Sequence, residues 1–222
     1  MESDNQQDAD HAERVILIHG LSGNRWVLGP LNRFLAQNQY LPTRWCYRSV
    51  GNSVTNHAQR LRAFLKGEAD SLEPLHFVTH SMGGIILRAV LADMHWRRPG
   101  RLVMLAPPNH GSRVAALAAR GLHYLCPALS DISTSPDSLV HRLPMVDSLD
   151  TGVIAGTQDI LVHLESTYIE NQVDHVLVPC GHNRILRHPE SLREILHFLR
   201  TGRFSEGACR TAPAASPRGV MV

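Results

Sequence analysis

Short apolar segments that alternate with helix-patterned segments constrain the fold of this 222-residue chain more than any other feature. The strand candidates are residues 15–18, 43–47, 75–79, 101–106, 152–156 and 175–178. Most of them are predominantly apolar, so both faces of such a strand must be covered, which is typical of parallel sheets. We therefore predict an α/β fold: a three-layer sandwich with a mostly parallel six-stranded sheet and helices on both faces.

Helical spacing of apolar residues fills the stretches between the strands. The predicted helices are 28–35, one that opens near 53, 82–95, and 189–202. The last of these has proline at its first position and glycine at its end, as helix termini prefer. We divide the chain into a flexible polar arm (1–13), one α/β domain (14–202) with a possible small cap insertion (107–150), and a disordered tail (203–222).

Composition excludes several classes of protein. The formal net charge is only +2 and the basic residues are scattered, so we expect no nucleic-acid partner. The four cysteines form no C-x-x-C pair, and we expect neither a metal nor an organic cofactor. The amino terminus lacks the pattern of a secretory signal, and no apolar stretch approaches the ~20 residues of a membrane span. We expect a cytoplasmic protein without stable membrane insertion.

The segment Thr79-His80-Ser81-Met82-Gly83-Gly84 carries the most chemical information. A serine lies between a buried strand and a helix and is followed by glycines, which is the context of a nucleophile elbow. Thr79 stands where the G-x-S-x-G pattern has its first glycine. The alternative is that Ser81 only caps the following helix, but a cap needs neither the glycine pair nor the buried strand. His80 should point away from Ser81.

A serine hydroxyl needs a base, and the base needs an orienting acid. His182 directly follows the last predicted strand, and Asp159 follows the strand before it. The chain order Ser81, Asp159, His182 is the nucleophile, acid, base order of α/β enzymes with this elbow. As alternatives, His182 is a surface turn residue and Asp159 a turn former, with Asp147 and Asp150 as substitute acids.

An acyl-transfer intermediate also needs two donors for its oxyanion. We predict the backbone N–H groups of Met82, directly after the nucleophile, and of Leu21, in the loop after the first strand. Asn109 and His110 follow another strand end, where ligands of α/β proteins bind, and are candidates for substrate binding. A plain turn at Asn109 is an equally good interpretation.

These motifs resemble the α/β-hydrolase superfamily, specifically its small bacterial lipases and esterases. The resemblance covers roughly 14–204 and rests on His19-Gly20, the Ser81 elbow, the placement of Asp159 and His182, and a P-P-N-x-G-S block. Thr79 and Ile160 depart from the pattern of many relatives, yet neither replaces a catalytic group. The resemblance implies the same fold, no cofactor, and a Ser-His-Asp hydrolase of esters.

We therefore predict an enzyme that cleaves a small-molecule carboxylic ester or lipid through an acyl-enzyme. The apolar character of the 107–150 insertion suits a medium or long acyl chain. A thioesterase or an acyltransferase would use the same triad and remains an alternative. A binding protein that keeps the fold without catalysis is a further one, since fold alone does not fix function.

Overall fold

The computed structural model describes residues 12–210 except 22, 24, 25 and 93. Six strands form one sheet in the order β2-β1-β3-β4-β5-β6, and every neighbouring pair is parallel. The strands are β1 (Glu13–Ile18), β2 (Tyr40–Trp45), β3 (Leu75–His80), β4 (Pro99–Leu105), β5 (Asp150–Gly156) and β6 (Asp174–Val178). The predicted fold class and the six strands are confirmed.

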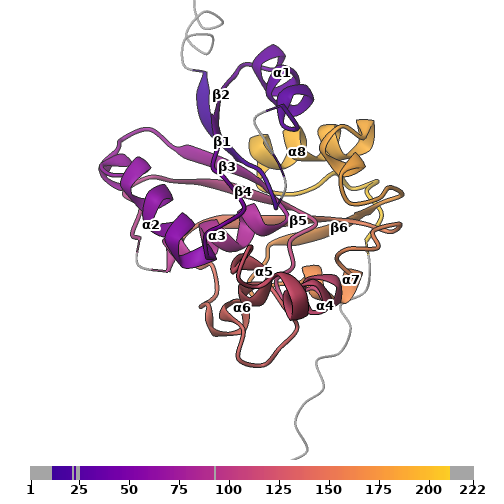
Figure 1. Cartoon of the computed structure of the whole chain (residues 1–222). Helices are drawn as coiled ribbons and strands as arrows, with labels where there is room; N and C mark the ends of the chain where they lie inside the picture. The colour runs from indigo at the N-terminus through magenta and orange to yellow at the C-terminus, as the bar shows by residue number, and fades with distance from the viewer. Residues whose placement is uncertain (1–11, 22, 24–25, 93, 211–222) are drawn as a thin grey trace, which may run out of the picture.

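Helices cover both faces of the sheet (Figure 1). On one face lie α1 (Gly29–Gln37) and α8 (Pro189–Thr201), and on the other α2 (Val54–Phe64) and α3 (Met82–Leu91). Ser53 caps α2 by accepting the Asn56 N–H at 3.2 Å. Gly202 ends α8 with φ +79°, a conformation that glycine adopts without steric cost.

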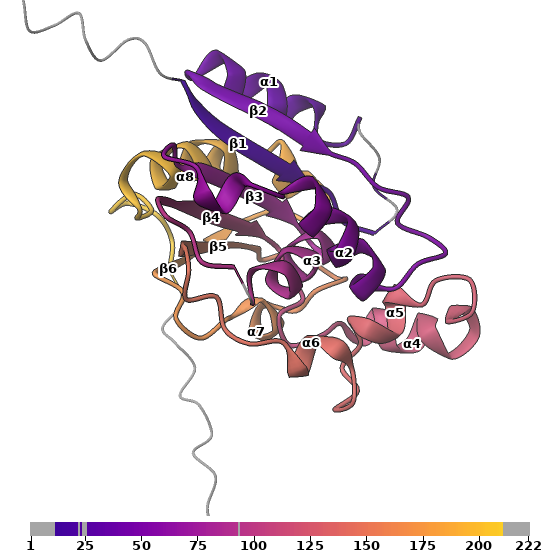
Figure 2. The ribbon, with the colours of Figure 1, turned by 90° about the vertical axis from the view of Figure 1, so that its left-hand side faces the viewer.

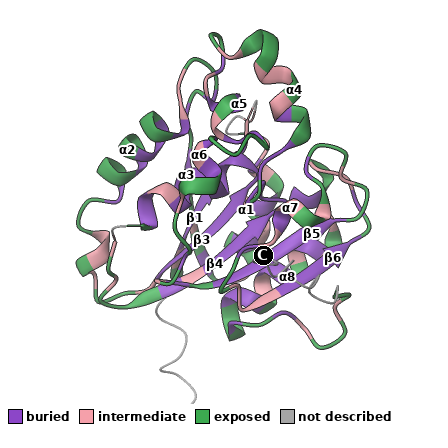
Figure 3. Ribbon diagram, turned by 90° about the horizontal axis from the view of Figure 1, so that it is seen from below, coloured by how far each residue is buried: buried purple, intermediate pink, exposed green. Residues whose placement is uncertain are grey.

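The strands separate two apolar cores because successive side chains point to opposite faces. Ile16 and Ile18 pack with α2 and α3, whereas Val15 and Leu17 pack with α1 and α8. Every residue of β3 is buried, as expected of a central parallel strand. Figure 3 shows the same contrast: the strands are mostly buried, and exposed residues lie on the outer sides of the helices.

The insertion after β4 forms a small helical layer beyond the carboxyl ends of the strands. It contains α4 (Arg113–Leu122), α5 (Ala128–Asp131) and α6 (Leu139–Arg142), and α4 and α5 stand out from the rest of the fold in Figure 2. The short segments α7 (Leu164–Thr167), η1 (Glu68–Asp70) and η2 (Arg184–Leu186) complete the described elements. None of the described helices is both long and apolar enough to cross a bilayer.

Residues 203–210 differ from the predicted disordered tail. Phe204 packs on Phe198 of α8, and the Leu177 N–H of β6 donates to the Cys209 carbonyl at 2.8 Å. Arg210 donates to both carboxylate oxygens of Asp174 at 3.0 Å. The stretch 203–217 mixes small residues and prolines without periodicity, and the contacts of Cys209 and Arg210 depend on β6 residues far earlier in the chain. The rest of the predicted tail (211–222) and most of the predicted arm (1–11) lie outside the described residues.

Candidate active site

Ser81 occupies a sharp turn between β3 and α3. Its backbone has φ 52° and ψ −128°, a conformation that non-glycine residues rarely adopt. The turn is held because the Ser81 N–H donates to the Leu105 carbonyl of β4 at 2.9 Å. A serine in a strained turn at the carboxyl edge of a parallel sheet has the geometry of a nucleophile elbow.

Glycines after Ser81 let α3 approach the sheet closely. A Cβ at Gly83 would lie 2.6 Å from the carbonyl oxygen of His19 and 2.7 Å from that of Ile18, so no larger residue fits. A Cβ at Gly84 would lie 3.1 Å from the Thr79 hydroxyl. Threonine is therefore accommodated at the first elbow position because the glycine that faces it leaves room. The hydroxyl of Thr79 is buried and has no hydrogen-bond partner among the described residues.

Asp159 and His182 are brought together from two loops. His182 Nδ1 lies 2.6 Å from Asp159 Oδ2, and the other carboxylate oxygen accepts the N–H groups of Leu161 at 2.8 Å and Val162 at 3.0 Å. Burial alone would raise the pKa of Asp159, but the His182 hydrogen bond and charge and the two backbone donors outweigh it and hold the pKa below its usual range. Asp159 is therefore an ionised acceptor that fixes the His182 ring.

The loop after β1 is organised by His19 and Tyr47. The Tyr47 N–H donates to His19 Nε2 at 3.3 Å, so Nδ1 carries the ring hydrogen and donates to the Gly20 carbonyl at 2.8 Å. Tyr47 also donates its hydroxyl to the His19 carbonyl at 2.8 Å, and the two rings stack. Burial lowers the pKa of His19, which favours this neutral form. The Gly23 N–H reaches the same Gly20 carbonyl at 3.2 Å, and this turn holds Leu21.

A hollow of about 600 Å³ contains Ser81, His182 and Leu21. Its remaining lining comes mainly from the insertion, and it contains no Asp, Glu, Lys or Arg: Val50, Pro108, Ser112, Val114, Ala115, Ala118, Leu122, Leu125, Cys126, Leu129, Ile132, Leu161, Val162 and Asn183. Met82 is the first residue of α3, directly after Ser81. The hollow therefore presents an uncharged, largely apolar surface next to the serine.

Asn109 and His110 lie outside that hollow and line a separate one of about 190 Å³. The Asn109 amide is fully engaged: Nδ2 donates to the Thr167 carbonyl at 2.9 Å, and Oδ1 accepts from Arg88 at 3.1 Å. Gly111, at φ +83°, closes a turn by donating to the Pro108 carbonyl. The structure thus agrees with the alternative of a turn at Asn109 and does not bring these two residues to Ser81.

Arg88 was not singled out from the sequence. It is buried within α3 and also donates to the Leu143 and Pro144 carbonyls at 3.2 and 3.3 Å, which ties the end of the insertion to that helix. Burial lowers the pKa of Arg88 to about 10, a value at which it stays charged near pH 7. A lone arginine among the apolar residues of 82–91 is the signal that could have revealed this role.

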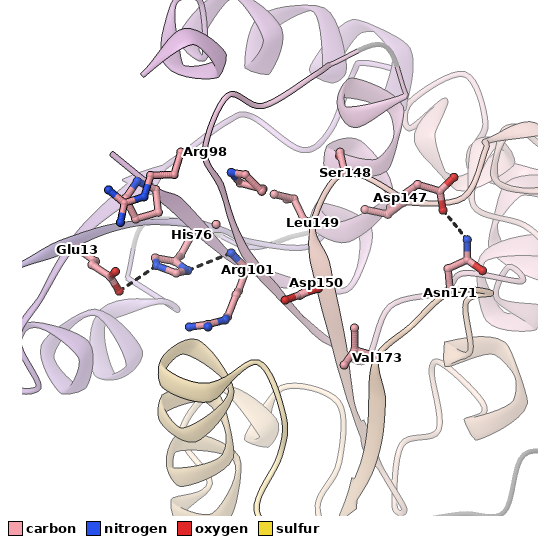
Figure 4. Close-up of a pocket in the computed structure, with 14 residues that line it drawn as sticks. Glu13, His76, Arg98, Arg101, Asp147, Ser148, Leu149, Asp150, Asn171 and Val173 are labelled. Carbon is pink, nitrogen blue, oxygen red and sulfur yellow. Dashed lines mark hydrogen bonds and ion pairs between the residues drawn. The ribbon is translucent and has the colours of Figure 1, made fainter. Parts of the chain in front are cut away.

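The substitute acids Asp147 and Asp150 lie at the opposite end of the sheet. They line a polar hollow of about 560 Å³ at the amino ends of the strands, together with Glu13 and His76 (Figure 4). His76 contacts Glu13 through Nε2 at 3.1 Å and accepts the Arg101 N–H at 3.0 Å. Neither aspartate lines the hollow that contains Ser81 and His182. Among the residues the structure describes, no cluster of three or more His, Cys, Asp or Glu side chains could hold a metal ion.

A sequence model of the alpha/beta hydrolase family matches residues 15–158. The chain belongs to the alpha/beta hydrolase family. The matched span of this alpha/beta hydrolase includes the Ser81 elbow and ends one residue before Asp159, so the assignment of acid and base depends on the geometry above. No curated protein sequence matches the chain significantly.

Solved structures similar to this alpha/beta hydrolase include a lipase, an esterase and a thioesterase. The mature lipase BlEst2 of Bacillus licheniformis has a TM-score of 0.66 and 16% identity over 88% of this chain and 94% of its own. The Pyrococcus furiosus esterase Pf2001 has a TM-score of 0.62 and 21% identity over 87% of this chain and 84% of its own. YbtT, a type II thioesterase of the yersiniabactin pathway, has a TM-score of 0.63 and 14% identity over 88% of this chain and 96% of its own. At these identities the similarity establishes the fold alone.

Proposed function

We propose that this alpha/beta hydrolase cleaves carboxylic esters with Ser81 as nucleophile, His182 as general base and Asp159 as the acid that orients the base. One observation carries the proposal: a serine in a strained strand-to-helix turn shares a hollow with a histidine whose other face is held by a buried carboxylate. This is the set of roles that a serine triad requires.

The reaction proceeds in two steps. His182 takes the proton of the Ser81 hydroxyl as its oxygen bonds to the ester carbonyl carbon, and the N–H groups of Met82 and Leu21 stabilise the oxyanion. The bond to the alcohol oxygen then breaks, and His182 protonates the departing alcohol, which leaves an acyl-enzyme. Water repeats the sequence: it loses a proton to His182, attacks the acyl carbon, and releases the acid as the proton returns to Ser81.

The lining of the hollow favours an uncharged acyl group. An apolar chain gains free energy from leaving water, about 0.8 kcal/mol for each buried methylene. A charged substituent would lose its hydration without meeting an opposite charge from an Asp, Glu, Lys or Arg side chain of this lining. Medium or long fatty acyl esters are therefore the proposed substrate class.

The test is the hydrolysis of p-nitrophenyl esters with acyl chains of increasing length. We expect Ser81→Ala and His182→Ala to lose about a thousandfold or more in kcat, and Asp159→Asn to lose about as much because its ring partner would be misoriented. Ser130→Ala and His95→Ala, at exposed positions, are matched controls that should keep full activity. Equal rates for Ser81→Ala and an active wild type would refute the site.

A thioester function is favoured by one observation, the similarity to the thioesterase YbtT, which is as close in fold as the lipase and the esterase. The same acyl group should therefore be offered as an oxygen ester and as a thioester. Product analysis with added alcohols would reveal acyl transfer. A kcat/KM that is at least about tenfold higher for the thioester would redirect the proposal to that substrate class.

A further inference from the structure

His80 directly precedes Ser81, yet its side chain contacts the loop of the proposed base. It is the last residue of β3 and is 4% exposed. Its Nε2 lies 3.0 Å from the backbone carbonyl oxygen of His182, which is 102 residues away in the chain. The two imidazole rings are 4.8 Å apart between centroids. The ring of His80 therefore lies beneath the main chain of the residue proposed as base.

The hydrogen on the His80 ring can be assigned. Burial, followed by the neighbouring His182, lowers the pKa of His80 to about 3, so this ring is neutral near pH 7. A neutral imidazole has one N–H and one bare nitrogen, and a backbone carbonyl only accepts. Nε2 must therefore carry the hydrogen and donate it to the His182 carbonyl.

The opposite side of the same ring faces the loop after β1, which holds Leu21. A Cβ at Gly20 would lie 3.3 Å from His80 Nδ1 and 2.7 Å from Ser81 Cβ, so Gly20 packs directly on both residues. His80 therefore lies between the loop that presents Leu21 and the loop that presents His182. The two loops are far apart in the sequence, so no local turn can fix their relative position.

We propose that His80 is a positioning residue, which fixes the main chain of His182 through its Nε2–H and thereby places the imidazole for proton transfer with Ser81. The inference rests on the proposed function, since it assigns a role relative to that base. Asp159 fixes the ring of His182 and His80 fixes its backbone, so two contacts together define where the base stands. Misplacement of a reacting group by about 1 Å can cost a hundredfold in rate.

The experiment separates the hydrogen bond from the shape of the ring. His80→Phe keeps a planar ring without a donor, whereas His80→Gln has an amide N–H that reaches about as far as Nε2. We expect kcat of the Phe variant to fall about tenfold to a hundredfold with KM nearly unchanged, and Gln to retain most of the wild-type kcat. Equal kcat for Phe and wild type, or equal losses in Phe and Gln, would overturn the proposal.

A second measurement does not depend on turnover. The hydrogen between His182 Nδ1 and Asp159 should give a low-field proton NMR signal, which we expect to broaden or shift in His80→Phe and to persist in His80→Gln. If the Phe variant does not fold, His80→Asn replaces it, because its shorter amide does not reach the His182 carbonyl.

The NMR measurement also distinguishes failure of the inference from failure of the proposed function. If the wild type hydrolysed no ester but the signal broadened or shifted in His80→Phe, the esterase function would be refuted and the positioning contact upheld. An unchanged signal in the donor-less variant would refute the contact.

Discussion

At the scale of single residues, Ser81 combines its proposed role as nucleophile with an unfavourable backbone conformation. A non-glycine residue at φ 52° and ψ −128° carries strain of order 1–3 kcal/mol, which the surrounding sheet must sustain. Replacement by glycine relieves the strain at some entropic cost. We expect Ser81→Gly to raise the free energy of unfolding by about 1 kcal/mol and to abolish hydrolysis. Urea denaturation and the ester assay measure both effects on one variant.

Ser81→Ala is the control for that prediction, because it removes the hydroxyl and keeps the Cβ that causes the strain. Its stability should stay closer to that of the wild type than the stability of Ser81→Gly. A glycine variant that is less stable than the alanine variant would show that the turn is relaxed rather than strained.

A site residue can be predicted from the sequence when the pattern that indicates it lies close to it in the chain. Ser81 directly follows β3, and Asp159 and His182 lie in the loops that follow β5 and β6, so their place at one edge of the sheet can be read along the chain. The contact of His80 with His182 joins segments whose approach depends on the packing of several elements, and no pattern near either residue indicates it. Asn109 also follows a strand, but its amide bonds with Arg88 and Thr167 hold it away from Ser81.

At the scale of elements, we propose that α4 limits the length of the acyl chain that the hollow accepts. Leu122 of this helix lines the hollow, whereas Leu117, five residues earlier on the same helix, does not. We expect Leu122→Trp to fill part of the space and to lower kcat/KM for the longest active esters about tenfold, with little change for acetate and butyrate esters. A series of p-nitrophenyl esters gives the measurement.

Leu117→Trp is the matched control, because the same substitution on the same helix adds an aromatic ring outside the hollow. It should leave the chain-length profile of the wild type unchanged. If the two tryptophan variants gave the same profile, α4 would have no part in selecting the acyl chain.

The predictability of elements depends on burial and length. The interior strands are well predicted, because a short run that is apolar on both faces is typical of a buried parallel strand. The strand expected at 43–47 instead spans Tyr40–Trp45 and includes Pro42, which an outer strand tolerates because it needs no ladder N–H there. Helices α5, α6 and α7 are four residues each, too short for a periodic pattern to appear.

At the scale of the whole molecule, buried histidines make stability depend on pH. Burial is the main cause that lowers the pKa of His57 to about 4, of His80 to about 3 and of His175 to about 4. In the unfolded chain each binds a proton near pH 6.5. Their stabilising contribution is therefore complete above pH 6.5 and is lost as the pH falls toward 4, because the unfolded state then binds more protons.

Three such groups give a slope of up to about 4 kcal/mol per pH unit around pH 5, which urea titrations between pH 7 and 5 would measure. His57→Phe is the matched variant, since neither ring nitrogen of His57 has a hydrogen-bond partner among the described residues. It should reduce the slope by up to about 1.4 kcal/mol per pH unit. A stability that stays constant from pH 7 to 5 would contradict this account.

The segment 203–210 has a consequence for how molecules of this protein meet one another. An outer strand with free N–H and C=O groups is a template on which another chain can add a strand, and proteins with such strands tend to aggregate. On β6, the Cys209 carbonyl occupies the Leu177 N–H, and the ion pair between Arg210 and Asp174 holds the segment there. A chain shortened after Gly202 would keep its proposed catalytic residues and expose this template, so its solubility would decline before its chemistry did.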